Sequence, residues 1–320
     1  MKASHPMEPI VSEDAFPPFS LEEYAQRLQR TREEMARRNI DLLYVTQPSH
    51  MCYLHGYTCS WYRAAATSSW PPLAGTAVHV DHDEMIHFDF SDEIGQLEAT
   101  SITRDRRIFP NEAMTPALDF LVNELTAEGW LAGSNAGLEF WSFVPSRAVS
   151  EQVEARLRAG GARDVLDGSF VLRTVRRIKS SHEIRCIEQG VQLADLGLRA
   201  AASIARPGIS ENEVYGEALR AMLAAGGEME GINQGFNVRG VPHTYSSRRR
   251  IKVGDIGGFD ICGVVNRYHG NVARAYYFRE PDQKTRDAYR ISAEAYDIVS
   301  DVARPGVEVG VLNEAGVLKD

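Results

Sequence analysis

The sequence predicts a protein of mixed α/β class with two domains. The chain has 320 residues, which is roughly twice the size of a typical domain of about 150 residues. Hydrophobic residues make up 43% and charged residues 25% of it, as in ordinary globular proteins. Strand-like runs alternate with helix-like segments up to about residue 170, and a basic segment at 173–183 follows. We therefore expect one domain at 1–170 and a second domain at 171–320.

The elements of the first domain follow from local patterns. Ser20 and Glu23 form an S-x-x-E capping box, which predicts a helix that continues to about Asn39. The aliphatic run at 41–46 predicts a short buried strand. Two segments that alternate apolar and polar residues around a polar turn predict a hairpin, at 76–81 and 85–90. Further helices are expected at 111–128 and 145–159.

Capping boxes also mark the helices of the second domain. Ser180 with Glu183, and Ser210 with Glu213, predict two helix starts, and the helices should end at Pro207-Gly208 and at Gly226-Gly227. Strands are expected at 230–238, 255–265 and 268–279. A long helix should cover 281–303, and a last helix should begin near 309.

Composition disfavours several classes of protein. The net charge of −9 lacks the basic surface that nucleic-acid binding requires. No apolar run reaches the roughly 18 residues of a membrane-spanning helix. The four cysteines contain no C-x-x-C pair, so neither a zinc site nor a disulfide framework is indicated. We expect a cytoplasmic protein with reduced thiols that binds neither nucleic acid nor membranes.

Several motifs resemble one known family. RRIKSSHEI at 176–184, Pro-His at 242–243, K-x-G-D at 252–255 and the strand pair at 259–274 occur in the order found in the creatinase/prolidase/aminopeptidase P family. The first half, from Tyr24 to Tyr57, resembles the N-terminal domain of creatinase and ectoine hydrolase. The resemblance implies a creatinase-like α/β domain followed by a pita-bread catalytic domain. It also implies a homodimer, and a catalytic domain whose C-terminal part is missing from this sequence.

The resemblance bears on metal binding through two strand residues. The family's metallopeptidases hold two metal ions with two Asp, one His and two Glu. Asp260 matches the first Asp, but Asn271 occupies the position of the second. The His and Glu ligands would follow residue 320. Because a neutral amide is a weak ligand for a hard cation, we expect no cofactor. The alternative is a divalent metal ion, namely manganese, iron, cobalt or zinc; otherwise Asp260 is a paired strand carboxylate.

His243 is the candidate catalytic residue. It follows Pro242, before the K-x-G-D motif, where the family places a histidine over the reacting centre. In metal-free creatinase that histidine shuttles a proton during C–N hydrolysis. Imidazole suits this role because its pKa lies near neutral pH. The alternative is a loop histidine that only hydrogen-bonds to the backbone.

Trp61 and Arg63 are the candidate substrate-binding residues. The stretch C-S-W-Y-R at 59–63 matches a creatinase segment that reaches into the neighbouring subunit's site. A guanidinium group fits a carboxylate well. The alternative is an aromatic residue and an arginine on a surface loop. The histidines and aspartates at 79–89 are instead expected to form the solvated face of the hairpin.

We therefore expect a creatinase/prolidase-like hydrolase that cleaves a C–N bond in a small, carboxylate-bearing substrate. Alternatives are a metallo Xaa-Pro dipeptidase or aminopeptidase, a lyase on the same fold, and an inactive truncated homologue that serves in binding or dimerisation. Ala273 stands where creatinase has a catalytic Glu, which disfavours creatine itself as the substrate.

Overall fold

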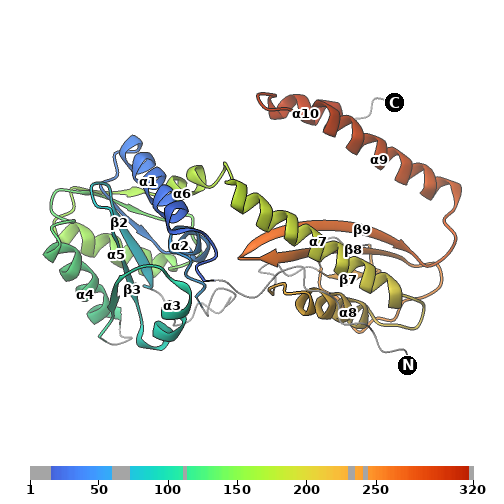
Figure 1. The fold of residues 1–320 in the computed structure, drawn as a ribbon, viewed down its shortest axis with the longest axis horizontal. Helices are drawn as coiled ribbons and strands as arrows, with labels where there is room; N and C mark the ends of the chain where they lie inside the picture. Colours follow the sequence, from blue (N-terminus) through green and yellow to red (C-terminus); the bar gives the residue numbers. More distant parts are fainter. Residues whose placement is uncertain (1–15, 60–72, 111–113, 230–234, 241–243, 317–320) are drawn as a thin grey trace. The chain divides into compact units, whose positions relative to one another are not determined.

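The computed structural model describes residues 16–59, 73–110, 114–229, 235–240 and 244–316 (Figure 1). The chain divides into two compact units. Unit 1 comprises residues 1–196, 221–232 and 262–271, and unit 2 comprises 197–220, 233–261 and 272–320. None of the helices in the described ranges is both long and apolar enough to cross a lipid bilayer.

Unit 1 contains a six-stranded mixed sheet with the order β4-β3-β2-β1-β5-β6. The strands are β1 (Leu42–Val45), β2 (Gly75–His79), β3 (Met85–Asp89), β4 (Asp105–Ile108), β5 (Asn135–Leu138) and β6 (Asp164–Asp167). The expected hairpin is confirmed, since β2 and β3 pair antiparallel. β1 pairs antiparallel with β2 and parallel with β5.

Helices cover both faces of this sheet. They are α1 (Leu21–Arg37), α2 (Pro48–His55), α3 (Ile94–Thr100), α4 (Met114–Ala127), α5 (Arg147–Ala159) and α6 (Ser169–Val175), with a 3₁₀ turn η2 (Ser91–Glu93) before α3. Alternate strand residues enter two separate cores. Leu42 and Tyr44 pack with residues of α4 and α5, whereas Leu43 and Val45 pack with residues of α1, α2 and α6. Both faces of the sheet are therefore buried.

Arg27 of α1 is a completely buried cation in unit 1. Its guanidinium group lies 4.0 Å from the ring centre of Phe19 and 4.6 Å from that of Tyr53. It donates to Glu23 at 2.8 Å and to the Tyr53 carbonyl at 3.0 Å. The Glu23 carboxylate also accepts from Ser180 Oγ at 2.7 Å. The charge of Arg27 is thus balanced by a hydrogen-bonded carboxylate, as a buried ion requires.

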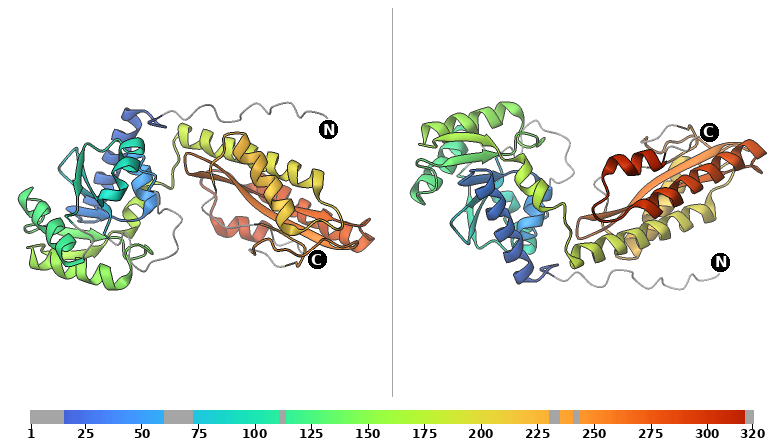
Figure 2. Two further views of the ribbon diagram at one scale, coloured as in Figure 1. Left: turned by 90° about the horizontal axis from the view of Figure 1, so that it is seen from below. Right: turned by 90° about the horizontal axis from the view of Figure 1, so that it is seen from above.

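The helix α7 (Ser181–Ile204) follows, and Figures 1 and 2 show it running along the hairpin of β8 (Ile256–Val265) and β9 (Tyr268–Tyr277). Its capping box forms as predicted, because Ser180 and Glu183 exchange backbone-to-side-chain hydrogen bonds of 2.7 and 3.2 Å. Helix and hairpin meet at Gly190, Gly263 and Gly270. A Cβ on Gly190 would lie 2.8 Å from both the Gly263 oxygen and the Gly270 nitrogen. Only glycine allows this contact.

Unit 2 contains most of α8 (Glu211–Ala224), then β7 (Phe236–Asn237), α9 (Gln283–Val302) and α10 (Val309–Gly316). The Ser210 capping box also forms. β7, β8 and β9 make a three-stranded sheet in that order. The strand expected at 230–238 is shorter in the described residues, where it comprises only β7. The ring of Phe236 packs edge-on against Phe259 and Tyr276 and fixes one end of this sheet.

Candidate functional site

The structure describes two of the five site residues that the sequence singled out. Asp260 lies on β8 and Asn271 lies on β9. His243, Trp61 and Arg63 lie outside the described residues.

Asp260 occupies a half-buried position on β8 between two fully buried residues, Phe259 and Ile261. Asp260 takes part in a hydrogen bond, an ion pair or another electrostatic interaction, so it is not a free carboxylate. On β9, the Asn271 amide donates from Nδ2 toward the Cys262 Sγ at 3.4 Å. Because side chains alternate along a strand, Cys262 and Asp260 share one face of β8. Asp260 and Asn271 thus belong to the same face of the hairpin.

His269 lies two residues before Asn271 and is half-buried. Its Nδ1 donates to the Arg267 carbonyl at 3.1 Å, which assigns the proton of the neutral ring to Nδ1. Burial lowers the pKa of His269 below its usual value. The ring is therefore neutral at pH 7.

Glu211 forms hydrogen bonds to described residues on both sides of the segment that contains His243. Its side chain is completely buried at the start of α8. The carboxylate accepts from the Val238 N–H and from the Ser247 N–H, both at 2.9 Å, and from the Ser247 hydroxyl at 2.5 Å. The Arg239 guanidinium group lies 3.5 Å away. One buried anion thus joins residues 238 and 247, on either side of His243.

Glu211 was missed by the sequence analysis. Glu213 explains the S-x-x-E pattern after Ser210, and its carboxylate does cap the helix. Glu211 lies between the two capping residues and plays no part in that box. The available signal was a second acid in the first helical turn, a position that favours anions in any helix.

The K-x-G-D motif forms the turn that leads into β8. Gly254 has a φ of +92°, which favours glycine. The Asp255 carboxylate accepts from the Lys252 N–H at 2.8 Å and from the Arg249 guanidinium at 3.1 Å. Arg249 therefore stabilises this turn through an ion pair with Asp255.

The polar residues of the β2–β3 hairpin correct one expectation. We expected His87 and Asp89 on a solvated face, but both are completely buried. Asp89 Oδ2 lies 3.1 Å from His87 Nε2, and His87 Nδ1 lies 2.9 Å from Thr76 Oγ1. Thr76 Oγ1 lies 2.8 Å from His55 Nε2, and His55 Nδ1 lies 2.8 Å from Ser101 Oγ. We call these five residues the buried polar chain.

Donor counting assigns every proton in the buried polar chain. A carboxylate only accepts, so His87 Nε2 donates to Asp89, and in a ring with one proton Nδ1 then accepts from the Thr76 hydroxyl. The Thr76 oxygen then accepts from His55 Nε2–H, and His55 Nδ1 accepts from the hydroxyl of Ser101. His55 is neutral in this arrangement. Burial, together with the nearby His87 and Arg106, keeps the pKa of His55 well below its usual value.

Tyr57 binds the buried polar chain at Asp89. The Tyr57 hydroxyl lies 2.7 Å from Asp89 Oδ2 and 3.1 Å from Glu93 Oε2. Burial and the Asp89 carboxylate raise the pKa of Tyr57 far above its ordinary value. Tyr57 therefore stays protonated and acts as a donor between two carboxylates.

Two family models match the chain one after the other. The model described as Creatinase/Prolidase N-terminal domain matches residues 27–178. The model described as Metallopeptidase family M24 matches residues 185–317. The chain belongs to the creatinase/prolidase family.

Members of the creatinase/prolidase family resemble the chain over most of its length. The Xaa-Pro dipeptidase of Pyrococcus furiosus is 23% identical over 88% of the chain and 73% of that protein. The ectoine hydrolase of Halomonas elongata is 25% identical over 90% of the chain and 74% of that protein. Among solved structures, the prolidase from Pyrococcus horikoshii has a TM-score of 0.70 and 20% identity, covering 91% of the chain and 76% of that structure. The fold is therefore that of the pita-bread prolidases.

The β8–β9 hairpin carries one carboxylate, Asp260, at the two positions that the resemblance assigns to metal-binding aspartates. Asn271 supplies a neutral amide in place of a carboxylate, and its nitrogen is directed to Cys262. Within the described ranges, no three or more His, Cys, Asp or Glu side chains lie close enough together to hold a metal ion. Carboxylates and imidazoles are the donors that such centres use.

Proposed function

We propose that this protein hydrolyses a C–N bond in a small substrate that carries a carboxylate, and that it does so without a metal ion. The observation that carries this proposal is Asn271, a neutral residue that is hydrogen-bonded to Cys262 on the family's catalytic hairpin. Pro242 and His243 are retained in the same chain. A chain that lacks the second carboxylate but keeps the histidine is suited to acid–base catalysis by imidazole.

Each candidate residue has a role in this proposal. His243 takes a proton from the attacking water and delivers it to the leaving nitrogen. Arg63 binds the substrate carboxylate, and Trp61 packs against the substrate body. Glu211 acts as a positioning residue, because its buried carboxylate joins the two flanks of the His243 segment.

The test is steady-state kinetics of the purified protein with ectoine, creatine and Xaa-Pro dipeptides as substrates. His243→Ala should lower kcat by about 10²–10⁴-fold, the usual contribution of general acid–base catalysis. Arg63→Ala should mainly raise KM, because a carboxylate anchor contributes uniform binding. The matched controls are His82→Ala and Arg199→Ala, two exposed side chains on other elements. If His243→Ala retains more than about a third of kcat, His243 is not the proton shuttle.

A second candidate function is that of a metallo Xaa-Pro dipeptidase, which the Pyrococcus furiosus relative favours. The two functions differ in metal content. Elemental analysis of the purified protein should find well under one manganese, iron, cobalt or zinc ion per chain if our proposal is right. A stoichiometric metal ion that is needed for activity would favour the dipeptidase instead.

We also propose that Trp61 and Arg63 act in the partner's site of a homodimer. His243→Ala and Arg63→Ala provide the test when they are mixed, allowed to exchange subunits and assayed at a substrate concentration far below the raised KM of Arg63→Ala, where each variant alone has little activity. In a twofold dimer with shared sites, an equal mixture should regain about a quarter of wild-type activity, because half of the dimers are mixed and each has one intact site. No regain despite proven subunit exchange would place Arg63 in its own subunit's site.

A further inference from the structure

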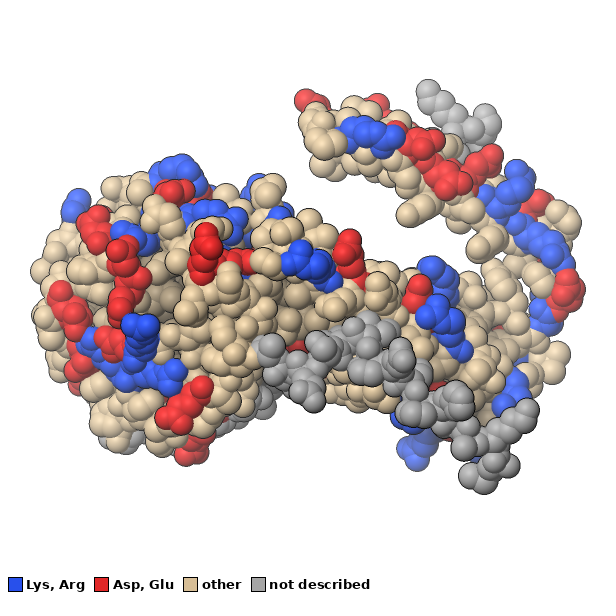
Figure 3. All heavy atoms as spheres, viewed as in Figure 1, with Lys and Arg blue, Asp and Glu red and all other residues tan. Residues whose placement is uncertain are grey.

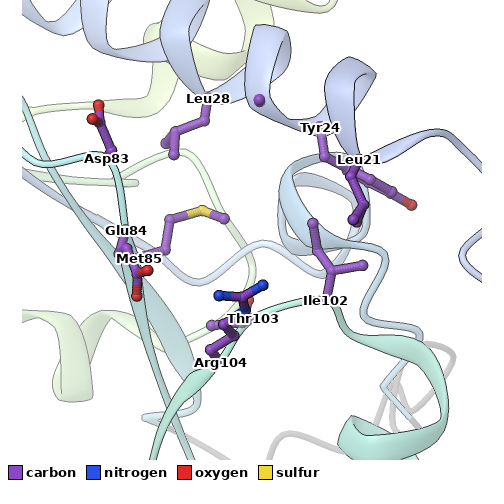
Figure 4. A pocket seen from close by; sticks show the side chains of 10 residues that line it. Leu21, Tyr24, Leu28, Asp83, Glu84, Met85, Ile102, Thr103 and Arg104 are labelled. Atoms are coloured by element: carbon purple, nitrogen blue, oxygen red, sulfur yellow. The ribbon is translucent and has the colours of Figure 1, made fainter.

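Unit 1 contains a pocket that is lined by none of the described candidate site residues. It has a volume of about 240 Å³. Its walls come from the first two turns of α1, from Asp83–Met85 where β3 begins, and from the segment 102–104 that precedes β4 (Figure 4). Pockets for drug-sized ligands usually measure about 300–1,000 Å³, so this one suits a smaller molecule.

The floor of the pocket is apolar. Leu28 and Met85 are buried beneath it, and Leu21 and Ile102 form its sides. Figure 4 shows Met85 and Ile102 on opposite sides of the space. A short aliphatic side chain would be removed from water on this floor.

Two polar side chains of the pocket, Arg104 and Thr103, lack partners among the described residues. Figure 4 shows the Arg104 guanidinium group in the middle of the space. Arg104 makes neither an ion pair nor a side-chain hydrogen bond with any described residue. Thr103 is 4% exposed, and its Oγ1 is buried with no hydrogen-bond partner. This oxygen has almost no accessible surface, so Arg104 rather than Thr103 is the polar group that a ligand would meet here.

The two acids at the rim differ in their pairing. Asp83 forms an ion pair with Arg32. Glu84 lines the same pocket but has no ion pair or side-chain hydrogen bond in the described structure. The pocket therefore offers a cation and an anion that have no partners among the described residues, together with an apolar floor.

We propose that this pocket binds a free α-amino acid with a short aliphatic side chain. Arg104 would hold the carboxylate as a charge-assisted pair, and Glu84 would hold the ammonium group. The ligand's side chain would rest on Leu28 and Met85. This binding site is independent of the proposed catalytic function.

The experiment is calorimetric titration of the full chain with L-leucine, followed by two analogues that each lack one charge. Leucinamide has no carboxylate, and 4-methylpentanoate has no ammonium group. Leucine should bind with a Kd of roughly 1 mM, which corresponds to about −4 kcal/mol. Each analogue should bind at least tenfold more weakly. Absence of leucine binding at about 20 mM, or equal binding of either analogue, would overturn the assignment.

Variants locate the binding within the protein. Arg104→Gln and Glu84→Gln should each weaken leucine binding about tenfold, as expected when a charge-assisted pair is lost. Arg199→Gln is the control. Thr103→Val is a second control: it should leave leucine binding unchanged, because the hydroxyl is inaccessible, and the melting temperature unchanged or higher, because that hydroxyl has no partner. Binding that is unaffected by Arg104→Gln would belong to another site and would refute the proposal.

Discussion

Thr76→Val tests whether the buried polar chain is ordered as donor counting assigns it. Valine has nearly the same shape as threonine, so the substitution removes one hydroxyl and leaves the packing of β2 intact. Thr76 is completely buried and joins His55 to His87. The variant therefore leaves two ring nitrogens without partners, namely Nε2–H of His55 and Nδ1 of His87.

The expected loss of stability follows from those two nitrogens. Each buried polar group without a partner costs about 1–3 kcal/mol, so Thr76→Val should lower the free energy of unfolding by about 2–6 kcal/mol. Thr76→Ser keeps the hydroxyl and loses only a methyl group. It should therefore cost about 1 kcal/mol, close to the value for one buried methylene.

Urea unfolding at pH 7.5 provides the measurement, with tryptophan fluorescence and far-ultraviolet circular dichroism as independent probes. The two variants should separate by at least about 1 kcal/mol if the hydroxyl bridges both histidines. If Thr76→Val is as stable as Thr76→Ser, the hydroxyl does not connect the rings, and the proton assignment is wrong.

Three other predictions concern buried ionisable groups. Burial keeps the pKa of His55 low in the folded state, so the unfolded chain binds more protons below about pH 6.5. The free energy of unfolding should therefore fall by up to about 1.4 kcal/mol per pH unit between pH 6.5 and pH 5. A free energy of unfolding that does not change with pH in urea titrations would contradict this. Arg27→Met should cost about 3–5 kcal/mol by leaving Glu23 buried without its cation, and adding Glu23→Gln should recover part of that loss in thermal unfolding. Glu211→Gln should lower kcat while Glu213→Gln should not, because only Glu211 joins the flanks of the His243 segment; equal kcat values in steady-state assays would remove its positioning role.

Local signals in the sequence predicted those parts of the fold that depend on neighbouring residues. The capping boxes at Ser180 and Ser210 formed because each pairs a hydroxyl with an acid three residues later. The β2–β3 hairpin was visible from alternation around a short turn. These features need no knowledge of distant contacts.

Features that depend on long-range pairing were not predicted. β4, with the sequence Asp-Arg-Arg-Ile, is too polar and too short to suggest a strand, and it forms because it pairs with β3. The alternation of polar and apolar residues correctly separated the two faces of β3. We predicted, however, that the polar face would be exposed to solvent. Helices cover both faces of this sheet, so His87 and Asp89 are buried. The residue pattern of β3 does not indicate that helices cover its polar face.

The contact of three glycines between α7 and the β8–β9 hairpin limits how these elements can move. Gly190 meets the backbone of Gly263 and Gly270 where any Cβ would collide. One helical turn away on α7 stand Cys186 and Ala194, which carry side chains. Sliding α7 by one turn would press one of them against the strands, so shear along the helix axis is blocked. Rotation about Gly190 is opposed as well, because the Tyr268 hydroxyl donates to Glu183 and the Tyr276 hydroxyl donates to the Leu198 carbonyl, both at 2.9 Å and on opposite sides of the crossing.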